Sequence, residues 1–437
     1  MELRETRQAV TPFRGLVVFF EFLRRVGYRK AVSKYLLFRL TSHHPIDPAQ
    51  TLTSFLLSVV AGARRFAHSS LLGADAASQT LLGISRFPGD ETIRNLFKYF
   101  GQGPCQHFFA GLWSWQLERL SECSAGYSLD LDSTVFERYG RQQGALRGQN
   151  SRKHGWPSHH PLVAVLAEPH FLLLGWLRSG NCGTARGVVE FFKEALALLP
   201  EKHAIRVVRA DVGFFDQQLL GFLDQRGLSY ILVARLTPVL KSEAARVTDW
   251  RDLDEHYAAG ESSLQLLGWD RPRRFVLIRE QLRAERASLG RKLLEVPGYT
   301  FRVFVTNLAL PPEELWRDYT RRADMENRIA ELKHELGADD FCLQAFFATE
   351  EAFRSSLLLF NLLGEFQRAS GFSTYRQPTT LRAQVFLCRA LLGRSGHRLV
   401  LHLSASWGGL QPRIPLLENV LAYGARTPPI LNPAPAT

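Results

Sequence analysis

A chain of 437 residues, with 46% hydrophobic residues and 21 prolines, is expected to be globular, with two or three domains, and not disordered. Its formal charge of +12 favours a polyanionic partner, nucleic acid before an acidic membrane surface. Five scattered cysteines without a C-x-x-C pair argue for a reducing compartment and against a disulfide framework or zinc site. The most apolar early run, 16–23, is short and contains Glu21, so neither a signal peptide nor a membrane span is expected.

Residues 1–122 are rich in helical patterns and predict an all-α N-terminal domain. The segment 55–67 predicts one helix, and 91–100, after a Pro-Gly turn, predicts another with Asp90 as a plausible N-cap. A helix, a tight turn and a basic helix are compatible with a DNA-binding helix-turn-helix. Most helical hairpins bind no DNA, so both alternatives stay open.

The next segment predicts strands. On the first strand, 127–135, Asp130 and Asp132 point to the same face because side chains alternate. A hairpin, a helix, a strand, a helix and a strand follow, which predicts an α/β fold on a mixed sheet with one antiparallel portion. These elements cover 161–166, 171–177, 184–199, 205–210, 215–226 and 229–234.

Residues 236–314 interrupt this order and predict a mainly β insertion, with strong strands at 273–279 and 299–306. Trp250 and Trp269 of this insertion either pack its core or stack on a flipped base at a DNA end. The predicted C-terminal elements are a helix at 350–367, a helical region at 369–426 with a short strand at 399–403, and a disordered tail at 427–437.

The stretch 315–336 contains neither proline nor glycine and predicts one helix of about six turns. At about 100° per residue, four apolar side chains form a stripe that docks this helix on a core, and a second set lies beside them. The second set holds one carboxylate, two cations and a phenol. The docking stripe is Met325, Ile329, Leu332 and Leu336, and the second set is Tyr319, Arg322, Glu326 and Lys333.

Carboxylates from three predicted elements can meet at one edge of the sheet. Asp130 or Asp132 lies on the first strand, and Asp211 ends a later strand that can be its neighbour. A helix packed on the sheet supplies Glu326. Hard oxygen ligands with open positions suit Mg²⁺ or Mn²⁺, and two such ions drive phosphodiester displacement. Structural alternatives exist, since Asp211 can cap the following helix and Glu326 can pair with Arg322.

The spacing Tyr-x₂-Arg-x₃-Glu-x₆-Lys from Tyr319 to Lys333 resembles the signature around the catalytic glutamate of bacterial insertion-sequence DDE transposases. Asp132-Ser-Thr and Asp211 stand where that family places its first and second aspartates. The resemblance implies a ribonuclease-H-like mixed sheet core, interrupted by the β insertion and preceded by the helical domain. The two parts of this core would be 123–235 and 315–368.

The resemblance also implies roles for individual residues. Asp132, Asp211 and Glu326 would be the catalytic ligands of two Mg²⁺ or Mn²⁺ ions. Asp132 is preferred to Asp130 because Asp-Ser-Thr is closer to the family pattern, although strand geometry leaves both open. Contacts to the DNA backbone near the transposon end would come from Tyr319, Arg322 and Lys333.

A basic segment follows the first strand. Residues 138–160 contain five Lys or Arg and no acid, together with glycines, glutamines and an aromatic, as in a mobile loop that closes on a phosphate backbone. A solvated basic loop is the alternative. His159 and His160 can reach the metal site, but a histidine beside a strand start is more often structural. The basic residues are Arg138, Arg141, Arg147, Arg152 and Lys153.

The sequence therefore predicts a metal-dependent DNA transposase that cleaves a strand at the transposon end and joins the freed 3′-OH to target DNA. The resemblance implies a homodimer bound to transposon-end inverted repeats and target DNA, in the nucleoid-associated cytoplasm and without a membrane partner. The alternatives are a ribonuclease-H-like nuclease without strand transfer and a catalytically inactive DNA-binding regulator derived from a transposase.

Overall fold

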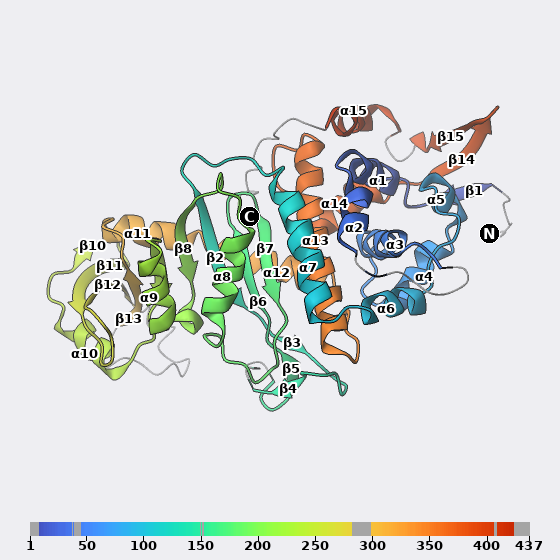
Figure 1. The fold of residues 1–437 in the computed structure, drawn as a ribbon. Helices are drawn as coiled ribbons and strands as arrows, with labels where there is room; N and C mark the ends of the chain where they lie inside the picture. The colour runs from blue at the N-terminus through green and yellow to red at the C-terminus, as the bar shows by residue number, and fades with distance from the viewer. Residues whose placement is uncertain are drawn as a thin grey trace, which may run out of the picture.

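The structure, a computed structural model, describes residues 8–36, 38, 45–148, 150, 153–281, 299–405 and 409–423. Within them, a nine-stranded mixed sheet extends from one end of the molecule to its middle (Figure 1). The N-terminal helices lie on the right of Figure 1 and the strands of the 236–314 segment on the left. A long helix, α13 (Phe346–Ala369), stands between the N-terminal helices and the sheet.

The N-terminal part is mainly helical, as its apolar spacing predicts. Its helices are α1 (Leu16–Arg25), α2 (Tyr28–Tyr35), α3 (Pro48–Val60), η1 (Phe66–His68), α4 (Ser69–Gly73), α5 (Ala76–Leu81), α6 (Asp90–Lys98) and α7 (Gln102–Leu117). α3 and α6 pack through Phe55 and Phe97, whose ring centroids lie 5.1 Å apart. The N-cap of α6 is Gly89 rather than Asp90, which lies in the first turn and pairs with Arg94 at 3.4 Å.

One short strand departs from the expected all-helical N-terminal domain. β1 (Ala9–Thr11) pairs antiparallel with β14 (Ala390–Ser395), which also pairs with β15 (Arg398–Leu403). The expected C-terminal helical region thus contributes a hairpin that binds the N-terminal strand. Local periodicity does not predict this sheet because its pairing joins the two ends of the chain. The helical elements around it are α14 (Pro378–Leu381), η5 (Arg382–Phe386), η7 (Gln411–Arg413) and α15 (Ile414–Ala422).

Nine strands of the described chain form the central sheet. The five predicted core strands are β2 (Tyr127–Ser133), β6 (Leu162–Leu166), β7 (Phe171–Trp176), β8 (Ile205–Ala210) and β9 (Tyr230–Val233). β2, β8 and β9 run parallel, whereas β6 and β7 form the predicted hairpin, with β6 antiparallel to β2. The first and fourth predicted strands, β2 and β8, are therefore neighbours, as expected. Their connections include α8 (Val188–Leu198), η2 (Val212–Phe214) and α9 (Gln217–Gln225).

The strands of the 236–314 segment extend the central sheet. The segment contributes α10 (Pro238–Arg246), β10 (Arg251–Asp252), β11 (Tyr257–Leu264), β12 (Arg273–Gln281) and β13 (Tyr299–Thr306). Because β13 pairs with β9, the complete order is β10-β11-β12-β13-β9-β8-β2-β6-β7. Trp250 and Trp269 are partly buried against Phe301 and Phe275, so both contribute to packing.

The basic segment carries a small sheet where its composition predicts a mobile loop. Its strands, in the order β3-β5-β4, are β3 (Phe136–Glu137), β5 (Pro157–His159) and β4 (Leu146–Arg147). His159 is buried, with Nδ1 accepting from Arg138 Nε and Nε2 lying 3.0 Å from the Gln143 carbonyl oxygen. His160 Nδ1 lies 2.7 Å from the Cys182 carbonyl oxygen. Both histidine side chains therefore bind backbone carbonyl groups of neighbouring loops and have structural contacts.

The stretch predicted as one six-turn helix is divided at Arg322. α11 (Pro312–Thr320) ends before it, α12 (Ala323–Ala330) follows, and a π-helical turn, η4 (Glu331–Glu335), completes the stretch. The Arg322 N–H donates to the Tyr319 carbonyl, three residues back, while the Arg322 guanidinium is buried against β2. The docking stripe is confirmed, because its four residues are buried: Met325, Ile329, Leu332 and Leu336.

The helix α13 is buried along most of its length and connects the sheet to the N-terminal helices. Its Asn361 side chain bonds both the N–H and the carbonyl of Leu172 on β7, at 2.8 and 2.9 Å. Its Glu365 accepts two hydrogen bonds from Arg119, at 2.6 and 2.8 Å. Among the helices that the structure describes, none is long and apolar enough to cross a membrane.

A buried charged cluster supports the helix that carries Glu326. The Oε2 atom of Glu331 accepts from the Tyr375 hydroxyl at 2.5 Å, and Oε1 lies 3.1 Å from Arg328. Arg328 also pairs with Asp324, which lies 3.1 Å from His170 Nε2. Burial raises the pKa of Glu331 to about 7, against the lowering effect of Arg328 and Tyr375. The cluster joins this helix to the β6–β7 turn and to the segment after α13.

Replacing Glu331 with glutamine should flatten the pH dependence of folding stability. The native pKa of Glu331, about 7, exceeds its ordinary 4.5, so the native state holds this proton more tightly than the unfolded chain. The resulting stabilisation is complete below about pH 4.5 and is lost as the pH rises to about 7, a change of at most about 3 kcal/mol. Urea unfolding of both proteins across this window measures it. The exposed control Glu314→Gln should follow the wild type, and a Glu331→Gln curve parallel to the wild type would contradict the assignment.

Candidate active site

The parallel strands β2 and β8 place two aspartates at one edge of the sheet. Leu131 of β2 is in register with Ala210 of β8, so the next residues, Asp132 and Asp211, lie side by side. The Asp132 side chain is 13% exposed, and its Oδ1 accepts from the Ser133 N–H at 2.7 Å. The strand order thus brings the two carboxylates together as the sequence predicts.

The Asp130 side chain points to the same face of β2 as Asp132, but its oxygens are bonded to another residue. It is 1% exposed, and Arg209 of β8 donates to both of its oxygens, at 2.7 and 2.9 Å. The remaining guanidinium nitrogen of Arg209 donates to the backbone carbonyl and to Oδ1 of Asp318 on α11, at 2.6 and 3.1 Å. This buried guanidinium joins β2, β8 and α11. Of the two alternatives on β2, Asp130 has both oxygens bonded to Arg209, whereas the pKa of Asp132 is raised by the charges of Asp211 and Glu326.

Asp132 lies among two carboxylates and a guanidinium. An Arg322 nitrogen lies 3.3 Å from Asp132 Oδ2 and donates to the Leu131 carbonyl at 2.7 Å. Burial, with smaller contributions from the charges of Asp211 and Glu326, raises the pKa of Asp132 to about 6 against the lowering effect of Arg322. Like charges have this effect, so Asp132 lies within electrostatic influence of carboxylates from β8 and α12.

The second and third carboxylates are more accessible than the first. Asp211 is half-buried, and its Oδ1 accepts from the Gly213 N–H at 2.9 Å, so it also caps η2. Glu326 is exposed on α12, and Arg322, its alternative partner, pairs with Asp132. In the part of the chain that the structure describes, no three His, Cys, Asp or Glu are grouped closely enough to hold an ion. The donor chemistry of the three carboxylates nevertheless fits Mg²⁺ or Mn²⁺, which prefer hard oxygens.

The other three residues of the Tyr-Arg-Glu-Lys spacing contact the protein interior. Tyr319 is 8% exposed and packs on Phe304 of β13, at a ring-centroid distance of 4.7 Å. Arg322 is buried against β2, as described above. Lys333 Nζ donates to the Val135 carbonyl at 3.0 Å. These contacts fasten α11, α12 and η4 to the sheet at three points.

The basic residues that follow β2 differ in exposure. Arg138 is 2% exposed and donates to His159 and to a backbone carbonyl in the α12–α13 connection, so its contacts are internal. Arg141, Arg147 and Lys153 are exposed. Arg152 lies outside the described residues. Three of the five cations are thus accessible from solvent.

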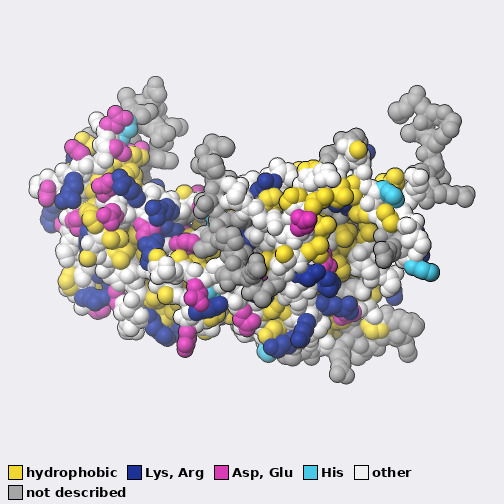
Figure 2. All heavy atoms as spheres, turned by 90° about the horizontal axis from the view of Figure 1, so that it is seen from above, with side chains coloured by type: hydrophobic (Ala, Val, Ile, Leu, Met, Phe, Trp, Pro, Cys, Tyr) yellow, Lys and Arg dark blue, Asp and Glu magenta, His cyan; other side chains and the backbone are white. Residues whose placement is uncertain are grey.

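Basic side chains elsewhere are spread over the surface. On the face shown in Figure 2, Lys and Arg are interspersed with Asp and Glu at the end formed by the strands β10–β13, and hydrophobic side chains are frequent toward the other end. On this face, the net charge of +12 therefore does not gather into a single basic patch.

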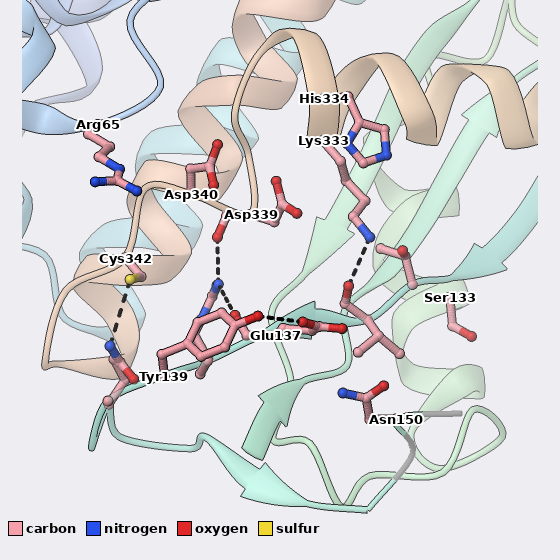
Figure 3. A pocket seen from close by; sticks show the side chains of 15 residues that line it. Arg65, Ser133, Glu137, Tyr139, Asn150, Lys333, His334, Asp339, Asp340 and Cys342 are labelled. Carbon is pink, nitrogen blue, oxygen red and sulfur yellow. Dashed lines mark hydrogen bonds between the residues drawn. The ribbon is translucent and has the colours of Figure 1, made fainter. Parts of the chain in front are cut away.

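A cavity of about 710 Å³ opens beside the chain segment that begins at Ser133, the last residue of β2 (Figure 3). It is lined by Ser133 from β2, Lys333 from η4, Asp340 from the following turn and Arg65 from the N-terminal part. In Figure 3, Lys333 reaches from its helix toward the strand segment after β2. A second cavity of about 500 Å³ shares Arg65 and Asp340 and continues to α6. The hollow therefore extends from the end of β2 to the N-terminal helices.

Two residues described above, Arg209 at the sheet edge and Arg65 in the cavity wall, have no role in the sequence-based prediction. Arg209 has a weak signal, since an arginine within an apolar strand needs a buried counterion to avoid a cost of several kcal/mol. Arg65 has no local signal, because only tertiary packing brings it to the cavity.

Comparison with protein families decides the class of this protein. The family model described as "Transposase DDE domain group 1" matches residues 2–422. The chain belongs to this family of DDE transposases. No curated protein matches the chain. Among solved structures, it is similar to a piggyBac transposase synaptic complex with hairpin DNA, with 11% sequence identity over 87% of this chain and 82% of that chain, at a TM-score of 0.45.

The match confirms the transposase family inferred from the spacing around Glu326. As a DDE transposase, the protein is an enzyme that acts on DNA, and DDE transposases depend on divalent metal ions. Its fold is mixed α/β with a large mixed sheet, also as predicted.

The buried Arg209 network generates a stability prediction. Asp130→Asn should destabilise the transposase by about 3–5 kcal/mol, because it leaves the Arg209 guanidinium buried without a full counterion. Glu261→Gln, which removes a partly exposed partner of Arg274, should cost about 1 kcal/mol or less. Urea unfolding compares the two variants. Equally small losses of unfolding free energy in the two variants would show that burial of the Arg209 guanidinium does not require the charge of Asp130.

Proposed function

We propose that Asp132, Asp211 and Glu326 form the catalytic centre at which this transposase cleaves DNA at transposon ends and joins the 3′-OH to target DNA. The observation that carries the proposal is the register of β2 and β8, which sets Asp132 beside Asp211 within electrostatic reach of Glu326. Asp132 is the ligand from β2, since both oxygens of Asp130 are bonded to Arg209.

Each protein group has a distinct part in this proposal. Divalent ions held by the three carboxylates, Mg²⁺ or Mn²⁺ and two in number, would activate the attacking oxygen and stabilise the leaving oxygen. Arg322 balances the charge of Asp132 and holds it at the sheet edge. Glu326 stays exposed on α12, where it can complete a site with the two aspartates. The protein otherwise contributes alignment of the DNA strand for in-line displacement.

We assign DNA backbone contacts to the accessible cations. Arg141, Arg147 and Lys153 lie on the segment beside the cavity, and Lys333 lines the cavity wall. Arg152 belongs to the same basic stretch of the sequence and is assigned the same role. We assign Tyr319, Arg322 and Arg138 to holding the site in place, because their described contacts are internal.

We further propose a ribonuclease-H-like core formed by 123–235 and 315–368, with the intervening residues as an insertion that extends the core sheet. Residues 1–122, together with the C-terminal hairpin of 369–426, would bind DNA beside it. A homodimer on paired inverted repeats, acting on DNA in the bacterial cytoplasm, agrees with the Tyr-Arg-Glu-Lys spacing.

Glu326→Gln should abolish strand cleavage, by at least about 10³-fold, while DNA affinity changes little, because the side chain is exposed and the charge is lost only at the centre. Gel assays with DNA from the element's own ends and Mg²⁺ measure cleavage and joining separately. The matched control, Glu314→Gln on α11, should cleave like the wild type. Retained cleavage in Glu326→Gln would exclude this glutamate, and cleavage without joining in the wild type would favour a nuclease.

Replacing both Arg141 and Arg147 with alanine should weaken DNA binding and reduce the slope of log affinity against log salt by roughly 1 for each phosphate that is no longer neutralised. The control is Arg246→Ala on α10, whose side chain is also exposed but lies near the other end of the sheet (Figure 1). Fluorescence anisotropy over a salt series gives the slopes. An unchanged slope in the double variant would remove these two arginines from the interface.

A further inference from the structure

Two exposed aromatic rings lie together beside the cavity. Tyr139, which follows β3, is 72% exposed, and Trp156, which precedes β5, is 48% exposed. Their ring centroids lie 5.7 Å apart at an interplanar angle of 59°. Single exposed aromatics are common on protein surfaces, but a contacting pair at the rim of a cavity marks a binding surface.

The pair is held in place through polar atoms at its edge. The Tyr139 hydroxyl donates to Glu137 Oε2 at 2.9 Å and accepts from Lys153 Nζ at 2.8 Å. Lys153 also pairs with Glu137 at 2.7 Å, and its carbonyl accepts from the Trp156 N–H at 3.1 Å. The Lys153 ammonium lies 5.3 Å from the centre of the Tyr139 ring. The ring positions are therefore organised while much of their surface stays in water.

The pair is adjacent to the proposed catalytic edge. Tyr139 lines the same cavity as Ser133, the residue after Asp132, and Figure 3 shows its hydroxyl directed toward Glu137 at the cavity wall. The lining is largely polar and charged. Such a lining suits a nucleic acid strand better than the apolar anchor of a protein partner.

We propose that Tyr139 and Trp156 form a stacking platform for an unpaired nucleobase of the DNA strand that enters the cavity. The inference rests on the proposed function, because that function supplies the strand. Stacking on an aromatic face accepts any base, and a neighbouring lysine adds attraction for the phosphates. The platform lies between the first strand and the hairpin of the core, outside the insertion and its two tryptophans.

The test uses a duplex with a short single-stranded tail that carries 2-aminopurine, whose fluorescence is quenched by stacking. Ca²⁺ in place of Mg²⁺ keeps the probe intact. Binding of wild type should quench the tail, and the Tyr139→Ala, Trp156→Ala double variant should lose the quench. Its affinity for tailed over blunt duplex should fall by roughly 5- to 100-fold, the range of one stacked base. Trp156→Phe, which keeps a ring, should retain most of the quench.

The control is Tyr257→Ala on β11, which removes a partly exposed ring that also contacts a second ring, Trp316 at 4.7 Å, but lies toward the other end of the central sheet and does not line either cavity. Its quench should match the wild type, and thermal unfolding should show all variants folded. A folded double variant with an unchanged quench overturns the platform, as does a changed oligomeric state with an unchanged quench. Cleavage with Mg²⁺ is measured separately. If the fluorescence quench depends on the two rings but the wild type does not cleave DNA, the result supports the platform and rejects the catalytic proposal.

Discussion

The geometry of the active edge depends on the buried guanidinium of Arg209. It bonds Asp130 on the neighbouring strand and Asp318 on α11, so one side chain sets the relative positions of β2, β8 and the helix before Glu326. A buried guanidinium is costly unless its N–H groups are hydrogen-bonded to acceptors. A shift in the register of β2 against β8 would separate Arg209 from these partners. The same register sets Asp132 beside Asp211. Stability and the geometry of the proposed catalytic centre therefore share one interaction.

The break at Arg322 explains how α12 serves both the core and the site. On an uninterrupted helix, residues four apart point within about 40° of each other, so Arg322 and Glu326 would share one environment. In the structure the two side chains differ: Arg322 turns inward to the Leu131 carbonyl and Asp132, whereas Glu326 remains exposed. The cation then offsets part of the repulsion among the carboxylates. A regular helix would leave Asp132 more strongly opposed by its neighbours.

The sequence correctly predicted the features that depend on residues close together in the chain. The ends of β2 and β8 follow from alternating and apolar runs, and the docking stripe of α12 follows from helical periodicity. The failures are all non-local. β1 pairs with β14 from the other end of the chain, and β13 joins β9 because both expose a free edge. Arg138 belongs to a basic, polar segment whose composition is typical of a protein surface, yet tertiary packing buries its side chain against His159. Burial of a long basic side chain depends on partners that periodicity does not specify.

The N-terminal helices are part of the wall of the site and not an appended unit. Phe341, which follows the helix of Glu326, packs between Phe55 and Phe66, at ring-centroid distances of 4.9 and 5.2 Å. Beside it, Arg64 pairs with Asp340 at 2.7 Å, and both cavities include Asp340 in their lining. The sheet alone supplies two aspartates at an open edge. The N-terminal helices and the turn after η4 together form part of the wall of the hollow that continues from this edge, so the hollow is complete only when both parts of the chain are folded.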